Sequence, residues 1–173
     1  MSLVSDTIRI TGVVRESIVD GPGIRFVVFA QGCPHRCKGC HNEASHDFSA
    51  GNECKTEKIV SEIEKDPLIS GVTFSGGEPF CQPEGFLDLA MKLKEKKINI
   101  LAFTGYTYEE LAKIQEKNES VKKLIENIDV LIDGPFVWEK RDLTQQFRGS
   151  ANQRYIDLNA TRENGALVEL ENL

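Results

Sequence analysis

Residues 24–42 read IRFVVFAQGCPHRCKGCHN and place a very apolar segment directly before a loop with three cysteines. The run Ile24–Phe29 is mostly β-branched or aromatic, which is typical of a strand buried on both faces in a parallel sheet. Cys33, Cys37 and Cys40 follow, with three residues between the first two and two between the last two. A short loop of this kind can wrap one compact inorganic group.

Three thiols on one loop favour an iron–sulfur cluster of an open kind. Such clusters normally take four cysteine thiolates. Three thiolates leave one iron without a protein ligand, so a small molecule can bind there. The spacing therefore favours a reactive cluster held by Cys33, Cys37 and Cys40 over a sealed electron carrier.

Three other interpretations of these cysteines stay open on the spacing alone. A structural zinc ion would need a fourth ligand from His35, His41 or His46, although no second pair of cysteines with metal-ligand spacing is present. The run Cys37–His41 matches the C-x-x-C-H attachment of c-type haem, which leaves Cys33 unexplained. Disulfides are disfavoured by the odd count of five cysteines and by the lack of an export signal.

Length and charge narrow the class of protein. The chain has 173 residues, which suggests one domain, and a complete eight-fold βα barrel typically needs about 250. The formal net charge of −6 argues against nucleic acid as the main partner. No apolar run approaches the roughly 18–20 residues of a membrane span, so we expect no membrane association. The first residues do not resemble a signal sequence, and we expect a cytoplasmic protein.

Apolar periodicity predicts strands and helices in alternation. The expected strands cover residues 7–14 (an edge strand), 24–29, 71–74, 98–103, 128–132 and, less regularly, 154–158. The expected helices cover residues 56–65, 83–97 and 108–125, the third broken near Asn118. Strand–helix alternation of this kind predicts an α/β fold with a mainly parallel sheet and right-handed crossovers.

Four unusual loops each follow an apolar strand. They are the cysteine loop, Gly76–Glu78 with its preceding Ser75, Thr104–Tyr106 and Asp133–Pro135. The carboxyl ends of parallel strands share one rim of a sheet, where active sites form. We therefore expect segments far apart in the sequence to line one pocket.

The cysteine spacing together with Gly-Gly-Glu-Pro after the next strand resembles the radical S-adenosylmethionine (SAM) family. The resemblance covers about residues 8–158 of a single domain spanning residues 1–173, and it implies an open, incomplete (βα) barrel. In that family the open iron of a [4Fe-4S] cluster chelates SAM, and an electron splits the sulfonium to give a 5′-deoxyadenosyl radical. The cofactors carry the hard chemistry and the protein orients them.

Further motifs are similar to those of the glycyl-radical-enzyme activases. They are Val19–Phe26, Gln31–His35 and Cys40–Asn42. A second set resembles the branch that acts on anaerobic ribonucleoside-triphosphate reductase: Cys37–Cys40, Phe103–Tyr106, Val130–Phe136 and Phe147–Gln153. This branch implies abstraction of a glycine Cα hydrogen on the large subunit of the reductase, with flavodoxin or ferredoxin as electron donor.

The resemblance also implies roles for individual residues. Cys33, Cys37 and Cys40 are the expected cluster ligands. The expected SAM contacts are Gly39, His41, Gly76, Gly77, Glu78 and Thr104. The expected partner contacts are Asp20, Gly21, Gly23, Arg25, Arg148 and Asn152, with the alternative that Arg148 only attaches the last strand to the sheet.

Some positions lie outside the family pattern. Ala102 takes a place where the pyruvate formate-lyase activase has an Asp that helps to bind a monovalent cation, which puts such a site in doubt even though Asp133 could supply a carboxylate. Cys54 and Cys81 are interpreted as ordinary free thiols, and His35 and His46 as bystanders.

Three alternative functions are kept beside this hypothesis. The first is an activase for another glycyl radical enzyme, such as one of the formate-lyase type. The second is a radical SAM enzyme for a small molecule, such as a deazapurine synthase. The third is a non-catalytic zinc or iron–sulfur binding module, which metal analysis would separate from the others.

Overall fold

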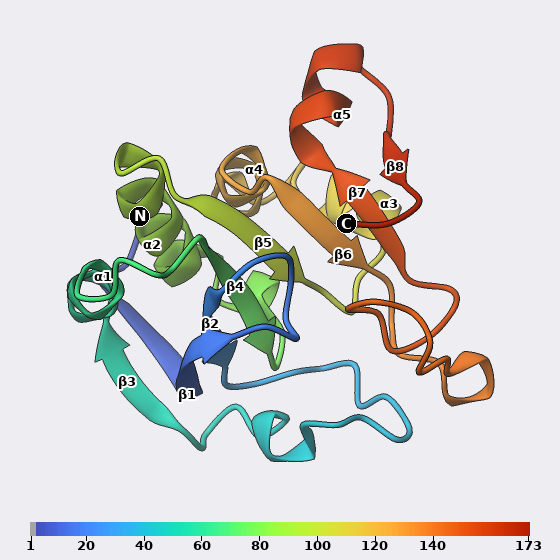
Figure 1. The fold of residues 1–173 in the computed structure, drawn as a ribbon, viewed down its shortest axis with the longest axis horizontal. Helices are drawn as coiled ribbons and strands as arrows, with labels where there is room; N and C mark the ends of the chain where they lie inside the picture. The colour runs from blue at the N-terminus through green and yellow to red at the C-terminus, as the bar shows by residue number, and fades with distance from the viewer. Residues whose placement is uncertain (1–2) are drawn as a thin grey trace.

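The computed structural model describes residues 3–173 as one eight-stranded mixed sheet with helices packed against it (Figure 1). Along the sheet, the strand order is β3-β1-β2-β4-β5-β6-β7-β8. The four central strands are parallel: β2 (Arg25–Ala30), β4 (Gly71–Gly76), β5 (Asn99–Phe103) and β6 (Val130–Asp133). The flanking strands pair antiparallel: β1 (Thr7–Ser17), β3 (Asn52–Lys55), β7 (Arg154–Asp157) and β8 (Glu169–Leu170). The open α/β architecture is the expected one.

Helices connect the parallel strands, and the sequence signals for them are clear. The α-helices are α1 (Thr56–Glu64), α2 (Pro83–Glu95), α3 (Tyr108–Ile114), α4 (Glu119–Glu126) and α5 (Leu158–Asn164). Three short 3₁₀ turns are η1 (Glu43–Ser45), η2 (Pro79–Cys81) and η3 (Trp138–Lys140). The expected break near Asn118 is confirmed, because its side chain accepts a hydrogen bond from the Val121 amide and starts α4 as an N-cap. No helix within residues 3–173 has both the length and the apolar character to cross a bilayer.

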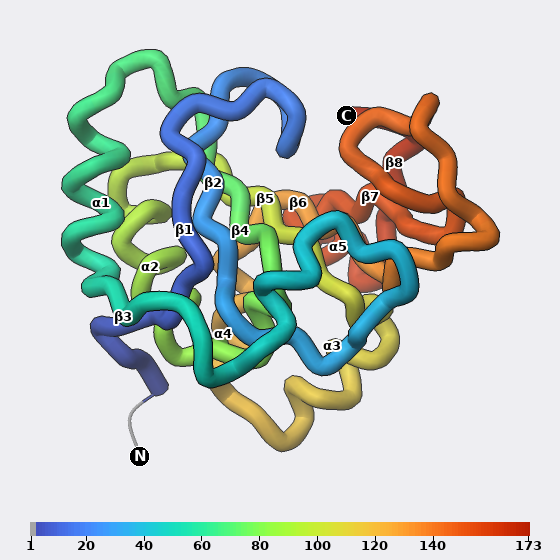
Figure 2. The backbone as a smooth tube through the Cα atoms, turned by 90° about the horizontal axis from the view of Figure 1, so that it is seen from below, coloured from blue at the N-terminus to red at the C-terminus, as the bar shows by residue number. Residues whose placement is uncertain are grey.

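The two faces of the sheet carry different side chains, because neighbouring strand residues point to opposite sides. One face packs its buried residues against the helices, among them Phe26, Phe74 and Ile100. The other face carries a smaller cluster of Leu101, Ile132 and Tyr155. Viewed from below, the loop that contains the cysteines crosses in front of the sheet, while α1 and α2 lie to one side (Figure 2).

Two details differ from the sequence prediction. β1 is not an edge strand, because the short polar strand β3 pairs with its first half through residues such as Ile8 and Cys54. The segment of β3 is NECK, with no buried residue, so apolar periodicity could not reveal it. α5 and β8 were also not expected, since their short segments lack a long periodic pattern.

Candidate functional site

The loops after β2, β4, β5 and β6 meet at one rim of the sheet, as their parallel arrangement predicts (Figure 1). A cavity of about 320 Å³ opens there, near the lower end of the range typical of ligand sites. Its walls come from all four loops and include Cys33, Gly77, Thr104 and Gly134. The cavity thus joins segments that are more than a hundred residues apart in the chain.

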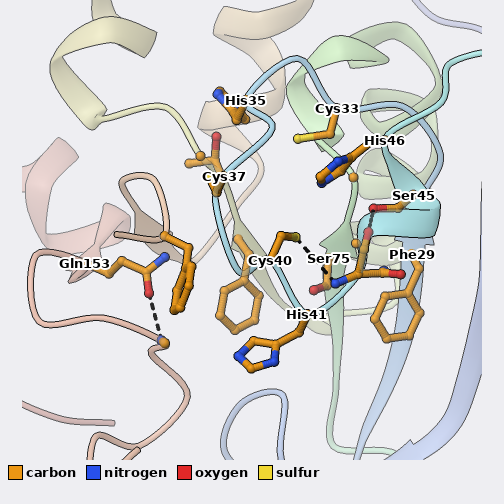
Figure 3. Close-up of a pocket in the computed structure, with 18 of the residues that line it drawn as sticks. Phe29, Cys33, His35, Cys37, Cys40, His41, Ser45, His46, Ser75 and Gln153 are labelled. Atoms are coloured by element: carbon orange, nitrogen blue, oxygen red, sulfur yellow. Dashed lines mark hydrogen bonds between the residues drawn. The ribbon is translucent and has the colours of Figure 1, made fainter. Parts of the chain in front are cut away.

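All three thiols of the cysteine loop line this cavity (Figure 3). Cys33 is 8% exposed, and burial raises the pKa of its thiol to about 11. Within residues 3–173, no three His, Cys, Asp or Glu side chains are grouped closely enough to hold a single metal ion. A cluster offers a different iron to each thiolate, so its ligands need not meet at one point. Soft thiolates along one cavity wall fit an iron–sulfur cluster chemically.

The carboxylate of Glu78 is buried beneath the rim and already satisfied by the protein. The side chain is 0% exposed and is not part of the cavity wall. Its Oε1 accepts hydrogen bonds from the Gly105 amide and the Thr104 hydroxyl, both at 2.8 Å. Its Oε2 accepts from the Phe80 amide at 3.1 Å, which makes Glu78 the cap of η2. Glu78 thus links the loops after β4 and β5, and a direct contact of its carboxylate with SAM stays a prediction.

His35 completes the group around Glu78 and is not a bystander. Its Nε2 lies 2.6 Å from Oε1 of Glu78, and because an ionised carboxylate can only accept, we assign the donor role in this contact to Nε2. The ring also packs edge-on against Tyr106, with 4.5 Å between the centroids. Only an indirect signal for this role was available in the sequence, because His35 lies inside a loop that was expected to share one rim with Gly-Gly-Glu, while no local pattern marked the histidine itself.

The other residues expected to contact SAM lie on or next to the cavity. Gly76, Gly77, Thr104 and His41 line it. A Cβ on Gly77 would lie 2.5 Å from the carbonyl oxygen of Gly32, so a side chain there would push the two strand ends apart. These glycines therefore let the loops after β2 and β4 approach each other closely.

An aromatic wall that the sequence did not reveal stands beside the cysteine loop. Gly39 has a left-handed backbone with φ +74°, and a Cβ there would overlap the ring of Trp138. Phe136 lies between His41 and Trp138, with centroid distances of 5.7 Å and 6.4 Å. The lack of a side chain at Gly39 thus leaves room for the Trp138 ring, while His41 and Phe136 line the cavity.

Arg25 lies at the opposite end of the sheet from the cysteine loop, in the core. It is 2% exposed, and its Nε donates to the Thr73 hydroxyl at 2.8 Å. Its Nη2 donates to the carbonyl of Val72 at 2.9 Å and to Oδ1 of Asn99 at 2.8 Å. Burial lowers the pKa of Arg25 to about 10, which the charge of Asp129 partly opposes. The expectation that Arg25 contacts a partner is therefore wrong, because its donors serve β4 and β5.

The turn before Arg25 is shaped by its glycines. Gly21 and Gly23 have φ values of +131° and +78°, and a Cβ on Gly23 would overlap Ser70. Asp20 lines the cavity, and its carboxylate accepts a hydrogen bond from Ser17 at 2.6 Å. Asp20 is thus the member of this turn that reaches the site.

Arg148 and Asn152 tie the last part of the chain to the sheet. The Arg148 guanidinium lies 4.2 Å from the ring centroid of Tyr155, and its Nη1 donates to the Gln153 carbonyl at 2.8 Å. Asn152 donates to the Pro135 carbonyl at 2.8 Å. Neither side chain lines the cavity. These contacts agree with the alternative in which Arg148 attaches the last strand, and their partner role stays a prediction.

Asp133 and the two remaining cysteines do not line the cavity. The Oδ1 of Asp133 accepts from Nε of Arg154 at 3.0 Å, and its Oδ2 accepts from the Tyr108 amide at 2.7 Å. This carboxylate is therefore already engaged and does not offer itself to a cation. Cys54 lies on β3, and Cys81 has its sulfur 3.9 Å from the Tyr106 hydroxyl.

Comparison with known proteins agrees with the site. Residues 19–156 match the family described as a 4Fe-4S single cluster domain. The chain is 37% identical over 145 residues to the anaerobic ribonucleoside-triphosphate reductase-activating protein of Vibrio cholerae, covering 79% of this chain and 89% of that protein. It is 37% identical over 127 residues to the pyruvate formate-lyase-activating enzyme of Clostridium pasteurianum, covering 70% and 53%.

The solved structure of QueE from Escherichia coli has a TM-score of 0.47 and 17% identity over 58% of this chain and 54% of that one. The family match and the Vibrio relative each span most of the chain, and the residues of the family match include the cysteine loop and the rim loops. The chain therefore belongs to the family of the anaerobic ribonucleoside-triphosphate reductase-activating proteins and carries a 4Fe-4S single cluster domain.

Proposed function

We propose that the chain activates an anaerobic ribonucleoside-triphosphate reductase by generating a glycyl radical on its large subunit. The observation that carries this proposal is the meeting of three thiols and the loops after β4 and β5 around one cavity. When bound, a [4Fe-4S] cluster and SAM would supply one-electron cleavage of the sulfonium, giving methionine and a 5′-deoxyadenosyl radical that takes a hydrogen atom from a glycine Cα.

Different residues of the chain would bind the cluster and make room for SAM. Cys33, Cys37 and Cys40 would hold the cluster. Gly76 and Gly77 keep this side of the cavity free of side chains, so the methionyl end of SAM can come close to the backbone. No general base is needed for hydrogen-atom abstraction, and a glycine target has no side chain to obstruct its approach.

The identity of the target rests on the relatives. The Vibrio protein named as a reductase-activating protein aligns over 89% of its own length, whereas the formate-lyase-activating enzyme of Clostridium aligns over 53%. The greater aligned share of the relative's length favours the reductase as the target. An activase for a formate-lyase-type enzyme remains the second candidate, because the identity to that relative is also 37%.

The reaction also needs a one-electron donor, for which we propose a flavodoxin or a ferredoxin. We further propose that the protein works in the cytoplasm. All five cysteines are free thiols, and a reducing compartment keeps such thiols available to iron.

One experiment tests the function directly. The protein, reconstituted anaerobically with iron and sulfide, is mixed with the reductase, SAM and a chemical reductant, and electron paramagnetic resonance is recorded. A glycyl radical signal that requires all components is expected. Cleavage of SAM without any radical on the reductase, but with radical formation on a formate-lyase-type enzyme, would select the second candidate. A protein that binds zinc and no iron would overturn the proposal.

A further inference from the structure

The middle of the cysteine loop, residues 34–41, is hydrogen-bonded to the loops after β4 and β5 through one described residue, His35. Residues 34–41 contain no helix or strand. Within the described chain, the contact between His35 and Glu78 is the only hydrogen bond from residues 34–41 to the loops after β4 and β5. Other ties of the loop lie at its start, where the amides of Gly32 and Cys33 donate to the carbonyls of Ser45 and His46, and the Gly32 carbonyl accepts from the Glu78 amide at 2.7 Å.

Glu78 connects His35 to two other loops at once. Its carboxylate accepts hydrogen bonds from Thr104 and Gly105 after β5 and from Phe80 after β4. The bond between His35 and Glu78 therefore connects the cysteine loop to both of these loops. No Lys or Arg within residues 3–173 forms an ion pair with Glu78. Hydrogen bonds to a buried charged group are among the stronger ones in proteins.

The surroundings of His35 are shaped to hold the imidazole. A Cβ on Gly105 would overlap the ring, so the residue after Thr104 must lack a side chain for the ring to lie where it does. Tyr106 closes the other side at a centroid distance of 4.5 Å. The ring therefore has a fitted place between the two loops, beyond its single hydrogen bond.

We propose that His35 is a positioning residue that holds the cysteine loop against the loops after β4 and β5 by way of Glu78. Its chemistry is that of a hydrogen-bond donor, and it does not itself need to touch cluster or SAM. The proposal deepens the proposed function, since the loop it holds is the one assigned to the cluster. In this way Glu78 would fix the position of the cysteine loop without lining the cavity itself.

The test measures the loop in the full-length metal-free protein, so it needs neither cluster nor SAM. The rate of alkylation of Cys33 is followed by mass spectrometry in wild type, His35→Leu, Gly105→Ala and the double variant. The first change removes the donor, and the second displaces the ring by sterics. Each should raise the rate by about ten-fold or more, because the loss of a hydrogen bond to a charged group favours local opening. The double variant should be no faster than the faster single variant.

Two further variants serve as controls. Lys38→Ala alters an exposed side chain of the same loop and should alkylate like wild type. His35→Gln keeps an N–H donor and should restore part of the protection. Unchanged Cys33 rates in both His35→Leu and Gly105→Ala would overturn the proposal. So would additive rates, or loss of the fold by circular dichroism in both, since a positioning contact is not needed for the core.

The same variants, reconstituted with iron and sulfide, give a second readout in the cluster signal of electron paramagnetic resonance. A shifted signal or lower iron content is expected in His35→Leu and not in Lys38→Ala. If the alkylation result holds while no SAM cleavage is found in wild type, the proposed function fails and the positioning role stands.

Discussion

Arg25 and Glu78 are buried charged side chains at opposite ends of the parallel strands, and they make different kinds of contact. Arg25 lies at the amino ends of the strands, 2% exposed, and donates to neutral acceptors of β4 and β5. Glu78 lies at the carboxyl ends, 0% exposed, and accepts from residues of three separate loops. The first charge joins strands that are already paired. Glu78 joins loops that are not paired to one another as strands, so its loss should impair the function of the site more than the stability of the fold.

The largest effect is expected at the carboxyl end, in the thiols themselves. Replacing Cys33, Cys37 or Cys40 by Ala should abolish SAM cleavage, because each thiolate would hold one iron. Iron content and 5′-deoxyadenosine formation are the measurements. Cys54→Ala, on the outer strand β3, is the matched control and should keep both. Retained cleavage in any of the three loop variants would contradict the ligand assignment.

At the amino end, Arg25→Met should cost about 3 kcal/mol of unfolding free energy, because several buried acceptors lose their donors. Urea unfolding measures this cost. Arg15→Met, at an exposed arginine whose partner is Glu62 on the surface, should change stability little. SAM cleavage per folded molecule should be unchanged in both. A loss of partner activation in Arg25→Met without loss of stability would restore the partner role for Arg25.

Glu78→Gln sharpens the comparison, because it keeps the shape of the side chain and removes its charge. We expect a stability loss of about 1.5–3 kcal/mol and a SAM affinity lower by about ten-fold, since the loops around the cavity lose their common acceptor. Calorimetric titration of the reconstituted protein with SAM gives the affinity. Wild-type affinity together with wild-type stability would show that the carboxylate has no such role.

A smaller effect is expected for Arg148→Ala, which removes the guanidinium from the ring of Tyr155. The stability loss should be about 1–2 kcal/mol, and SAM cleavage and glycyl radical formation should fall in parallel. A sharp fall of radical formation alone, with normal uncoupled cleavage, would instead favour the partner role. Asn152→Ala, which removes a donor to Pro135, should follow the same pattern.

The smallest expected effect is a change in how stability depends on acidic pH, and it arises at the amino ends of the strands, near Arg25. Burial raises the pKa of Asp129, but hydrogen bonds from Lys94, Asn159 and the Ile100 amide outweigh it and hold the pKa below its ordinary value of 3.8. A lowered folded pKa means that the stabilisation is present above the unfolded value and is lost as the pH falls through the folded one. Urea unfolding from about pH 5 to about pH 3 should therefore show a shallower loss of stability in Asp129→Asn than in wild type.

Sequence patterns predicted most elements because their signals are local. The nearly continuous apolar run Ile24–Phe29 became β2, and the Asn118 break became an N-cap, since both depend on neighbouring residues alone. The short strand β3 has no such pattern and owes its existence to pairing with β1. The rim position of the four loops was also predictable, because parallel connectivity brings strand ends together.

The roles of individual charged side chains were decided only by the tertiary structure. Arg25 was expected at a partner surface, and one of its hydrogen bonds is to Thr73, 48 residues away in the chain. His35 and Glu78 are separated by 43 residues, and nothing local distinguishes a histidine that packs into a glycine-bordered niche from one in solvent. By itself the sequence determined most of the strands, the loops that follow them and the spacing of the thiols, since these follow from short-range patterns. Which polar groups pair in the interior follows from packing across the sheet, because a buried charge takes whichever distant donors or acceptors the fold brings to it.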